Sequence, residues 1–598
     1  MSDLILPQHS NPLLQKNLEA FFKRYPYERS RLESLLSRPI ERQPVAQVKL
    51  PAAPSKPPIR VAIIAGMTSP QFIADYLNDS VIRKDNYLTF IVENNLEQLQ
   101  SAFQHWDLTQ LINYPKTEWL LMYDVDTIKA SFFSVMKREA VSSMMRNVFI
   151  ITTEVPQTPE ITEFYSKLVG VYDETCHHVL HNFGRIDDSL LGVKATFMNP
   201  NMILEYPGID QIKDHYKGIP AVVVGAGAST DYAIPIIKQF NDRILVIAAD
   251  AALKPLLKAG IRVDFTTSVE RLNEYQKPFF EGLEPLETEL VAFPVLHQDL
   301  IPLYPGPVRT CYRNYSWFAY FEKSWPKGII RCGGSTSHLA LGLAGWLGCS
   351  KVFMVGVDSC YEKHPTEELY RSHCKDTGYE DWNKYRPLAE FMTEKKHPPA
   401  FEMLDVLGNP TYTNITYYQW IKEYSEEVNL LGQKMLMINC SSKGLDIPGV
   451  PYRDLKTMLE KLDPIEIKRP PKQSAIIRRS LDHSDLIKHI VAWQNLCMDI
   501  SLNCDKILRD KEMTDAEFEV INAVYTIKLA SESLFVAFVV QCCAKEYFEM
   551  ENEWWALNQE WKEDRFEKIA VMKKRVDLFS GVLLKLIRIF EETNNGRN

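Results

Sequence analysis

The segment that most restricts how this chain can fold is Ala221-Val-Val-Val-Gly225-Ala-Gly227-Ala-Ser229-Thr230-Asp231. Its apolar run predicts a buried strand, and the two glycines followed by hydroxyl side chains predict a tight turn into a helix. Glycines allow backbone N–H groups to approach a phosphate, and the start of a helix adds a partial positive charge. Gly225, Gly227 and Ser229 are therefore candidates for nucleotide binding, with a simple strand-to-helix connection as the alternative. Thr230 replaces the third glycine of the dinucleotide-binding pattern, which argues against NAD.

Apolar runs of strand length recur through the centre of the chain and alternate with helical patterns. The further strands expected there are Arg243–Ala249, Asp264–Val269, Leu290–Pro294, Ile329–Cys332, Lys351–Val357 and Lys434–Ile438, with long helices at Ser335–Leu347 and Ile415–Leu431. Such alternation is typical of a mostly parallel sheet covered by helices. We therefore predict a Rossmann-like central domain over residues 206–463.

The regions on either side have different patterns. Residues 59–205 predict a second, smaller α/β domain, with strands at Arg60–Ala65, Tyr87–Val92, Trp119–Tyr123 and Asn147–Thr152. Residues 1–58 predict a helical segment followed by a proline-rich linker between Pro44 and Pro58. In residues 472–598 apolar side chains recur every three or four positions, which predicts an all-α bundle. The predicted fold class is thus α/β with a helical C-terminal domain.

Composition narrows the classes of function. The 598 residues carry a net charge of −9, which argues against nucleic acid as a partner. The longest apolar run, Leu534–Val540, is far shorter than the roughly 20 residues that span a bilayer, so no membrane span is expected. No secretory signal is recognised at the start of the sequence. The eleven cysteines are scattered, and we expect reduced thiols in a cytoplasmic protein.

Polar side chains follow the expected central strands. Asp250 ends one strand, and Ser268 and Glu270 end the next. Because the carboxyl ends of parallel strands line the ligand crevice, Asp250 is a candidate to accept hydrogen bonds from ribose hydroxyls, or else to cap the following helix. Glu270 is a candidate base or ribose ligand, with an ion pair to Arg271 as the alternative.

A second glycine-rich turn, Gly333-Gly334-Ser335-Thr336-Ser337-His338, precedes an Ala/Leu-rich helix. The start of such a helix suits a phosphate or a carboxylate, although an ordinary helix cap explains the same pattern. We therefore count Gly334, Ser335, Thr336 and Ser337 as candidate anion-binding residues, and expect a structural role for His338.

The strand Lys351–Val357 leads to Asp358 and then to a long polar stretch with His364 and His373. Either histidine is a candidate general base, because imidazole titrates near neutral pH. His364, His373 and Cys374 also suggest a zinc site, but their spacing matches no standard pattern and no fourth ligand is evident. We therefore predict no metal ligands here.

The order of these motifs resembles the domain shared by the motility-associated factors, or Maf proteins, which are flagellin glycosyltransferases. That family also has an α/β region before this domain and a helical region after it. The residues that carry the resemblance are Gly225-Ala-Gly227-Ala-Ser229, Ala248-Ala-Asp250-Ala-Ala-Leu, Val263-Asp-Phe-Thr-Thr-Ser268-Val-Glu270, Gly334-Ser-Thr-Ser-His338, Val355-Gly-Val-Asp358 and Ile438-Asn-Cys-Ser-Ser-Lys-Gly444-Leu-Asp-Ile-Pro-Gly449-Val-Pro451-Tyr.

The resemblance implies a cytosolic transferase that moves pseudaminic or legionaminic acid from a CMP-linked donor to Ser or Thr of flagellin, as flagellum assembly and motility require. The domain is also similar to bacterial sialyltransferases, whose chemical step needs no bound metal, and to the 6-hydroxymethylpterin pyrophosphokinase MptE, which uses ATP. We expect inversion of configuration, because no covalent nucleophile is evident. No cofactor is expected to be required, while Asp124-Val-Asp126 leaves a divalent cation open.

In the expected site, CMP lies across the strand ends and an acceptor hydroxyl gives its proton to His364 or His373. The residues expected to bind the nucleotide-sugar are Gly225, Gly227, Ser229, Asp250, Ser268, Gly334, Ser335, Thr336, Ser337 and Asp358, with Glu270 beside them as a third catalytic candidate. Two alternatives are an ATP-dependent pterin pyrophosphokinase and a non-catalytic protein that only binds flagellin.

Overall fold

The computed structural model describes residues 11–38, 60–66, 70–78, 86–136, 138–152, 158–182, 186–393, 400–432, 434–468, 484–519, 521, 539–557 and 565–595. Contacts divide the chain into two compact units. The first contains Met1–Arg185, Leu496–Tyr525 and Cys543–Phe579, and the second contains Ile186–Asn495, Thr526–Cys542 and Ser580–Asn598. The expected proline-rich linker and most of the apolar run Leu534–Val540 lie outside the described residues.

A four-stranded parallel sheet forms the centre of the first unit, in the order β3-β2-β1-β4. Its strands are β1 Val61–Ala65, β2 Leu88–Glu93, β3 Thr117–Leu121 and β4 Val148–Thr152, close to the predicted limits. The described helices of about two turns or more around it are α1 Pro12–Arg24, α2 Arg29–Leu36, α3 Pro70–Asn78, α5 Leu96–His105, α7 Val125–Met136 and α9 Pro159–Asn182. Every residue of β1 and β2 is buried, as in sheets covered on both faces.

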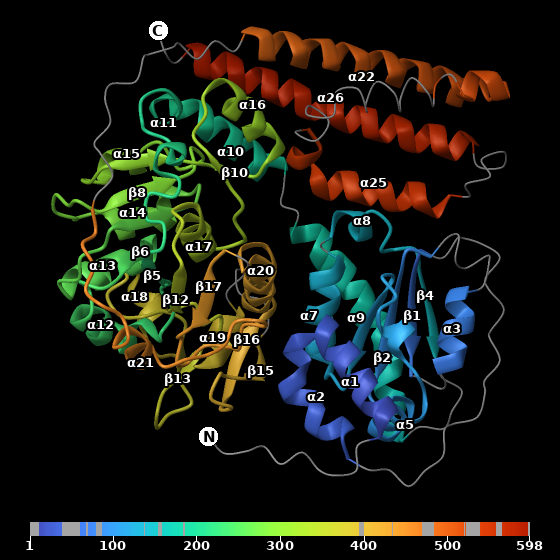
Figure 1. The fold of residues 1–598 in the computed structure, drawn as a ribbon. Coiled ribbons are helices and arrows are strands. Elements are labelled where there is room, and N and C mark those ends of the chain that lie inside the picture. Colours follow the sequence, from blue (N-terminus) through green and yellow to red (C-terminus); the bar gives the residue numbers. More distant parts are fainter. Residues whose placement is uncertain are drawn as a thin grey trace. The chain divides into compact units, whose positions relative to one another are not determined.

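The second unit contains a seven-stranded parallel sheet in the order β17-β12-β5-β6-β7-β8-β9 (Figure 1). Its strands are β5 Pro220–Val224, β6 Leu245–Ala249, β7 Phe265–Ser268, β8 Glu289–Ala292, β9 Val308–Thr310, β12 Lys351–Val355 and β17 Leu436–Asn439. The chain builds the sheet outward from β5 to β9 and then returns to place β12 and β17 on the other side of β5. The order therefore reverses between β5 and β12, the place where ligands bind in open α/β sheets.

Strand register brings the ends of the central strands to one level. Val224 lies between Val355 of β12 and Ala248 of β6, and Ala248 pairs in turn with Thr266 of β7. The residues that follow these strands consequently meet along one edge of the sheet.

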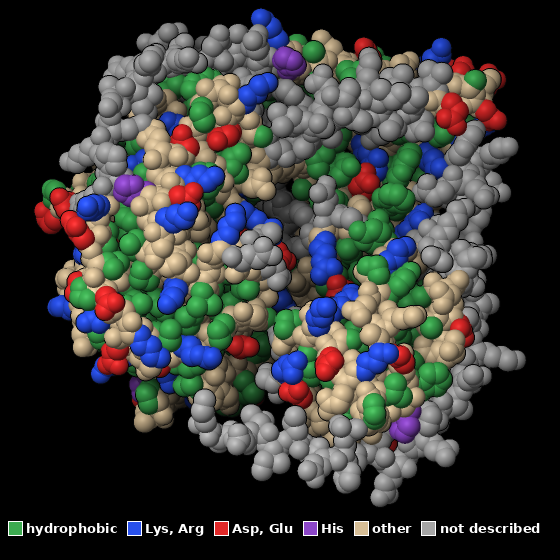
Figure 2. Space-filling model, in the orientation of Figure 1, with side chains coloured by type: hydrophobic (Ala, Val, Ile, Leu, Met, Phe, Trp, Pro, Cys, Tyr) green, Lys and Arg blue, Asp and Glu red, His purple; other side chains and the backbone are tan. Residues whose placement is uncertain are grey.

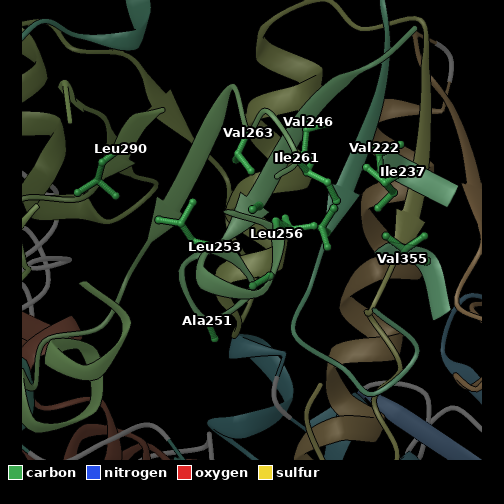
Figure 3. Close-up of a cluster of buried hydrophobic side chains, with 14 of the residues drawn as sticks. Val222, Ile237, Val246, Ala251, Leu253, Leu256, Ile261, Val263, Leu290 and Val355 are labelled. Carbon is green, nitrogen blue, oxygen red and sulfur yellow. The ribbon is translucent and has the colours of Figure 1, made fainter. Parts of the chain in front are cut away.

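One buried cluster fixes the helices against the sheet. Figure 3 shows Val222, Val246 and Val355 from neighbouring strands in the same cluster as Ile237 and Leu256. Ile237 belongs to α12 Thr230–Gln239 and Leu256 to α13 Asp250–Lys258, and these side chains are fully buried. Burying each such side chain stabilises the fold by about 1.5–3 kcal/mol. Helix α17, Thr336–Trp346, packs across β5, β6 and β7 outside this cluster.

One predicted strand of the central sheet is wrong. The segment Ile329–Cys332 contributes only Ile329–Ile330 (β11), which pairs with Tyr312–Arg313 (β10) in a separate two-stranded sheet. Val308–Thr310, whose three residues Val-Arg-Thr give no clear pattern, takes the edge position instead. β11 ends at Ile330, and Arg331 to Ser335 connect it to α17.

The described C-terminal residues are mostly helical, which confirms the predicted helical region. The helices are α22 Ser484–Asp510, α25 Ala544–Ala556 and α26 Arg565–Asn595. In the first unit Arg575 pairs with Glu551 at 2.5 Å, and in the second Gln494 donates to Ser580 at 2.8 Å. The predicted fold class, α/β with a helical C-terminal region, is thus confirmed, and the predicted domain limits stay a prediction.

The surface carries both kinds of charge, and the cysteines are free thiols. Figure 2 shows basic side chains interspersed with acidic and uncharged ones on one face. All eleven cysteines are buried and unpaired. Among the described helices, none combines the length and apolarity that crossing a membrane requires.

Candidate functional site

A cavity of about 440 Å³ lies at the carboxyl ends of four adjacent strands of the seven-stranded sheet. Ala226 and Gly227 after β5, Asp250 after β6, Glu270 after β7 and Asp358 after β12 all line it. The cavity is within the size range of small-ligand sites and includes the point where the strand order reverses.

The structure brings most of the predicted site residues to this cavity and leaves some outside it. The predicted residues that line it are Gly227, Asp250, Glu270, Gly334, Ser335, Thr336, Ser337, Asp358 and His373. Gly225, Ser229, Ser268 and His364 are not part of the lining. The two glycine-rich turns, more than a hundred residues apart in sequence, therefore border one cavity.

The glycines of the first turn allow a close approach of β12. The amide of Gly225 donates to the Val355 carbonyl and that of Gly227 to the Gly356 carbonyl, each at 2.8 Å. A Cβ on Gly225 would overlap the Gly356 carbonyl, and one on Gly227 would lie 2.6 Å from Asp358 Oδ2. Contact with the loop after β12 thus explains both glycines without a phosphate.

A carboxylate of the protein already occupies the start of α12. Asp358 accepts the Ser229 amide at 2.7 Å and also the Ser229 hydroxyl. Ser229 is buried, so the expectation that it faces a phosphate does not agree with its contacts. Burial raises the pKa of Asp358 to about 6, although the hydrogen bonds from Ser229 act in the opposite direction.

Asp250 is the centre of a small hydrogen-bond network. Its carboxylate accepts from the Ala251 amide at 2.9 Å, the Ser268 hydroxyl at 2.7 Å and Gln276 Nε2 at 3.1 Å. Ser268 therefore acts through Asp250, while Gln276, from α14 Asn273–Phe280, lines the cavity itself. Burial raises the pKa of Asp250 to about 6, against the lowering effect of these donors. A carboxylate has further acceptor positions, which a ribose hydroxyl could use.

The alternative considered for Glu270, an ion pair with Arg271, is not formed. Glu270 Oε1 accepts the backbone amide of Arg271 at 2.8 Å. The guanidinium of Arg271 pairs instead with Asp188 at 2.6 Å. Glu270 thus lines the cavity without an ion pair to Arg271.

At the second glycine-rich turn, two of the backbone amides already donate hydrogen bonds to side chains of the protein. Glu423 accepts the Gly334 amide at 2.6 Å, and His338 Nδ1 accepts the Ser335 amide at 3.2 Å. The next two amides, of Thr336 and Ser337, belong to the first turn of α17, where N–H groups have no partner within the helix. Both residues line the cavity, so an anion there can meet two donors and the helix dipole.

His338 has the structural role expected of it. The ring is buried and stacks on Tyr424, with centroids 3.9 Å apart. Its Nδ1 lies 2.6 Å from the Ser335 hydroxyl, and Nε2 lies 3.2 Å from the Trp420 carbonyl. Burial lowers the pKa of His338 to about 4, so the ring is neutral near pH 7.

The two candidate bases are in different places. His373 lines the cavity, its Nδ1 lies 2.8 Å from the Ser372 hydroxyl, and its ring stacks on Trp382 with centroids 4.7 Å apart. His364 lies outside the lining, against the Tyr385 ring. Of the two histidines, only His373 is therefore placed to meet a substrate in the cavity.

A buried ion-pair cluster holds the loop that carries His373. Arg371 contacts Glu362 at 2.5 Å and Asp231 of α12 at 2.6 Å. Arg371 thus connects the segment before His373 to α12, and removing it would leave both carboxylates without this cation.

One side of the cavity was not predicted from the sequence. Its members come from the segment that follows β14 (Tyr370–Arg371) and from α20 (Ile415–Leu431) with its N-cap residue: Ser372, Trp382, Asn414, Thr416, Tyr417, Trp420 and Tyr424. Helix α20 itself was predicted, but helical periodicity does not indicate which face meets a ligand.

The charges of the lining are acidic. Asp250, Glu270 and Asp358 are its carboxylates, and it contains no Lys or Arg. Within the described ranges, no group of three or more His, Cys, Asp or Glu side chains could hold a metal ion. An anionic ligand would consequently rely on backbone amides, hydroxyls and a helix start.

The fold and the cavity define an α/β protein with a candidate ligand site at the carboxyl ends of its central strands. Residues 194–364 match the family model described as 6-hydroxymethylpterin diphosphokinase MptE-like. The match covers both glycine-rich turns, Asp250, Glu270 and Asp358, and it confirms the resemblance of the central domain to MptE. No curated protein matches the sequence.

The chain is also similar to the solved structure of a Maf glycosyltransferase from Magnetospirillum magneticum AMB-1. The two share 14% sequence identity, the comparison covers 98% of this chain and 85% of the other, and the TM-score is 0.48.

Proposed function

We propose that this protein is a glycosyltransferase that moves a nonulosonic acid, pseudaminic or legionaminic, from a CMP-sugar to Ser or Thr of flagellin in the cytoplasm. The observation that carries the proposal is the single cavity in which Asp250, His373 and the start of α17 meet. These supply a ribose acceptor, a base and an anion site, the elements that transfer from an anionic nucleotide-sugar requires.

In the proposed reaction, Asp250 accepts hydrogen bonds from ribose hydroxyls, and the Thr336 and Ser337 amides hold the phosphate or the sugar carboxylate. His373 takes the proton of the acceptor hydroxyl as its oxygen attacks the anomeric carbon and the bond to CMP breaks. A single displacement inverts the configuration at that carbon. Orientation and anion stabilisation contribute most of the rate enhancement.

A pterin diphosphokinase is the second candidate, because the family model that matches residues 194–364 has that description. It requires ATP in place of CMP. The cavity wall from 372 to 424 lies outside the matched residues and provides contacts that the shared domain does not. We therefore favour the transferase.

The base assignment gives a direct prediction. His373→Gln should lower kcat for sugar transfer by about 100-fold or more, because a positioned general base contributes roughly 10²–10⁴ in rate. The measurement is transfer from CMP-legionaminic and CMP-pseudaminic acid to purified flagellin, followed by intact-protein mass spectrometry.

His364→Gln is the matched control, since His364 lies before β14 and outside the cavity lining, whereas His373 follows β14 and lines the cavity. Its kcat should stay within about twofold of the unmodified protein, a change of less than 0.5 kcal/mol in the barrier. Equal losses in the two variants would contradict the assignment, and no transfer by the unmodified protein would contradict the proposed function.

A further inference from the structure

The cavity has two walls. One is formed by residues that the family model matches, and the other by residues outside the match. Asp250, Gln276, Phe279 and the start of α17 lie within the matched residues 194–364. The wall on α20 lies outside them. A diphosphokinase and a nucleotide-sugar transferase both bind a nucleotide but differ in their other substrate. The matched wall is therefore suited to the nucleotide, and the α20 wall to the group that is transferred.

The chemistry of the α20 wall suits a sugar ring. Its members are aromatic or carry uncharged hydroxyl and amide groups: Asn414, Thr416, Tyr417, Trp420 and Tyr424. Aromatic faces pack against the C–H groups of a sugar, while hydroxyls and amides bond its oxygens. The α20 wall adds no carboxylate of its own, unlike the strand ends that carry Asp250 and Asp358.

The α20 wall is held rigidly at several points. The Tyr424 hydroxyl lies 2.6 Å from the Ser337 hydroxyl. Asn414 caps α20 by accepting the Tyr417 amide at 2.9 Å, and it donates to the Tyr361 hydroxyl at 2.7 Å. Rigid placement favours affinity because little side-chain freedom is lost on binding.

Trp420 sits directly against the second glycine-rich turn. A Cβ on Gly334 would lie 2.8 Å from Trp420 Nε1, so the absence of a side chain at Gly334 makes room for the indole. The ring is half-buried and lines the cavity. It thus lies next to the start of α17, where the proposed function places the phosphate or the sugar carboxylate.

We infer that Trp420, with Tyr417, binds the sugar ring of the donor, while the residues matched by the family model bind its CMP portion. This inference rests on the proposed function and adds the division of the cavity into two subsites. Trp420 is then a specificity-determining residue for the transferred group.

The test compares two ligands by calorimetry, CMP and CMP-legionaminic acid, the second repeated with CMP-pseudaminic acid. Trp420→Leu should raise the Kd of the CMP-sugar by about tenfold, as expected for a lost aromatic contact, with the Kd of CMP within about twofold. Gly334→Ala, whose Cβ would lie 2.8 Å from the indole Nε1, should displace the ring and change the ratio of the two Kd values in the same direction. Glu426→Gln, on the exposed side of α20, is the control and should change neither Kd.

Three outcomes are distinguishable if Trp420→Leu keeps its melting temperature, and Trp420→Met, which also lacks an aromatic ring, replaces it if it does not. An equal loss for CMP and the CMP-sugar would place Trp420 against the nucleotide and overturn the inference. Unchanged affinity for both ligands would show that Trp420 contacts neither of them, and would also overturn the inference. Binding of neither ligand by the unmodified protein would overturn the proposed function itself, and with it the inference.

Discussion

Asp250→Ala should raise the Kd of the protein for CMP by about 10- to 100-fold, because a hydrogen bond to a charged group contributes roughly 1.5–3 kcal/mol. The carboxylate is at the end of β6, lines the cavity and is held in place by Ser268 and Gln276. The measurement is calorimetric titration of CMP at constant pH and salt.

The matched control is Asp376→Ala, which removes an exposed carboxylate paired with Lys258 outside the cavity lining. Its Kd for CMP should be unchanged. If Asp250→Ala bound CMP as well as the unmodified protein does, Asp250 would be only a helix cap, which is the alternative that the sequence left open.

The pH dependence of stability tests a second property of Asp250, the raised pKa of its buried carboxyl group. Burial raises the folded-state pKa of Asp250 from 3.8 to about 6. The stability contributed by this shift is therefore fully present below pH 3.8 and is lost as the pH rises to about 6. Asp250→Asn lacks this titration, so its melting temperature relative to that of the unmodified protein should rise between pH 4 and pH 6.5 and then level off. A difference that stays constant with pH would contradict the shifted pKa.

Gly356→Ala should give the largest loss of stability, roughly 2–5 kcal/mol in the second unit, from left-handed backbone strain together with overpacking. Gly356 has a φ of +67°, and a Cβ there would overlap Thr230 Oγ1 and the Gly225 carbonyl. The contact cannot be relieved easily, because the Thr230 hydroxyl donates to that carbonyl at 2.8 Å. Thermal unfolding with a probe for the second unit measures the effect.

Gly408→Ala measures the cost of left-handed backbone strain in the absence of steric overlap with the new Cβ. Gly408 has a φ of +82°, but nothing lies within 4 Å of its Cβ position. This variant should lose only about 1–2 kcal/mol, the strain of the left-handed conformation alone. Equal losses at the two glycines would show that the close approach of β12 to the first glycine-rich turn contributes nothing.

Strands and helices of the α/β units were predicted well because each is specified by a local pattern. The four-residue apolar run before Gly225 and the apolar periodicity of 415–431 are each sufficient to indicate the element that forms. The short edge strand Val308–Thr310 was missed because three residues carry too little pattern. Periodicity therefore identifies elements of ordinary length and fails for the shortest ones.

The candidate site was predictable only where its residues follow a strand or begin a helix. Asp250, Glu270 and Asp358 are recognisable because a parallel sheet places its strand ends at one edge. Gln276 and Trp420 are brought to the cavity by packing between distant segments, and no local pattern indicates them. The first glycine-rich turn has the sequence of a phosphate-binding loop, yet its glycines lie against the loop after β12. A glycine pattern in the sequence does not identify which group will approach the backbone.

The most direct test of the proposed function is calorimetric titration of the unmodified protein with CMP, ATP and NAD, each in competition with a CMP-linked nonulosonic acid. We expect CMP to bind and to displace the CMP-sugar, and ATP and NAD to do neither. Binding of ATP with no binding of CMP would contradict a CMP-sugar transferase and favour the pterin diphosphokinase. Binding of none of the nucleotides would contradict both enzymatic proposals and favour the non-catalytic alternative.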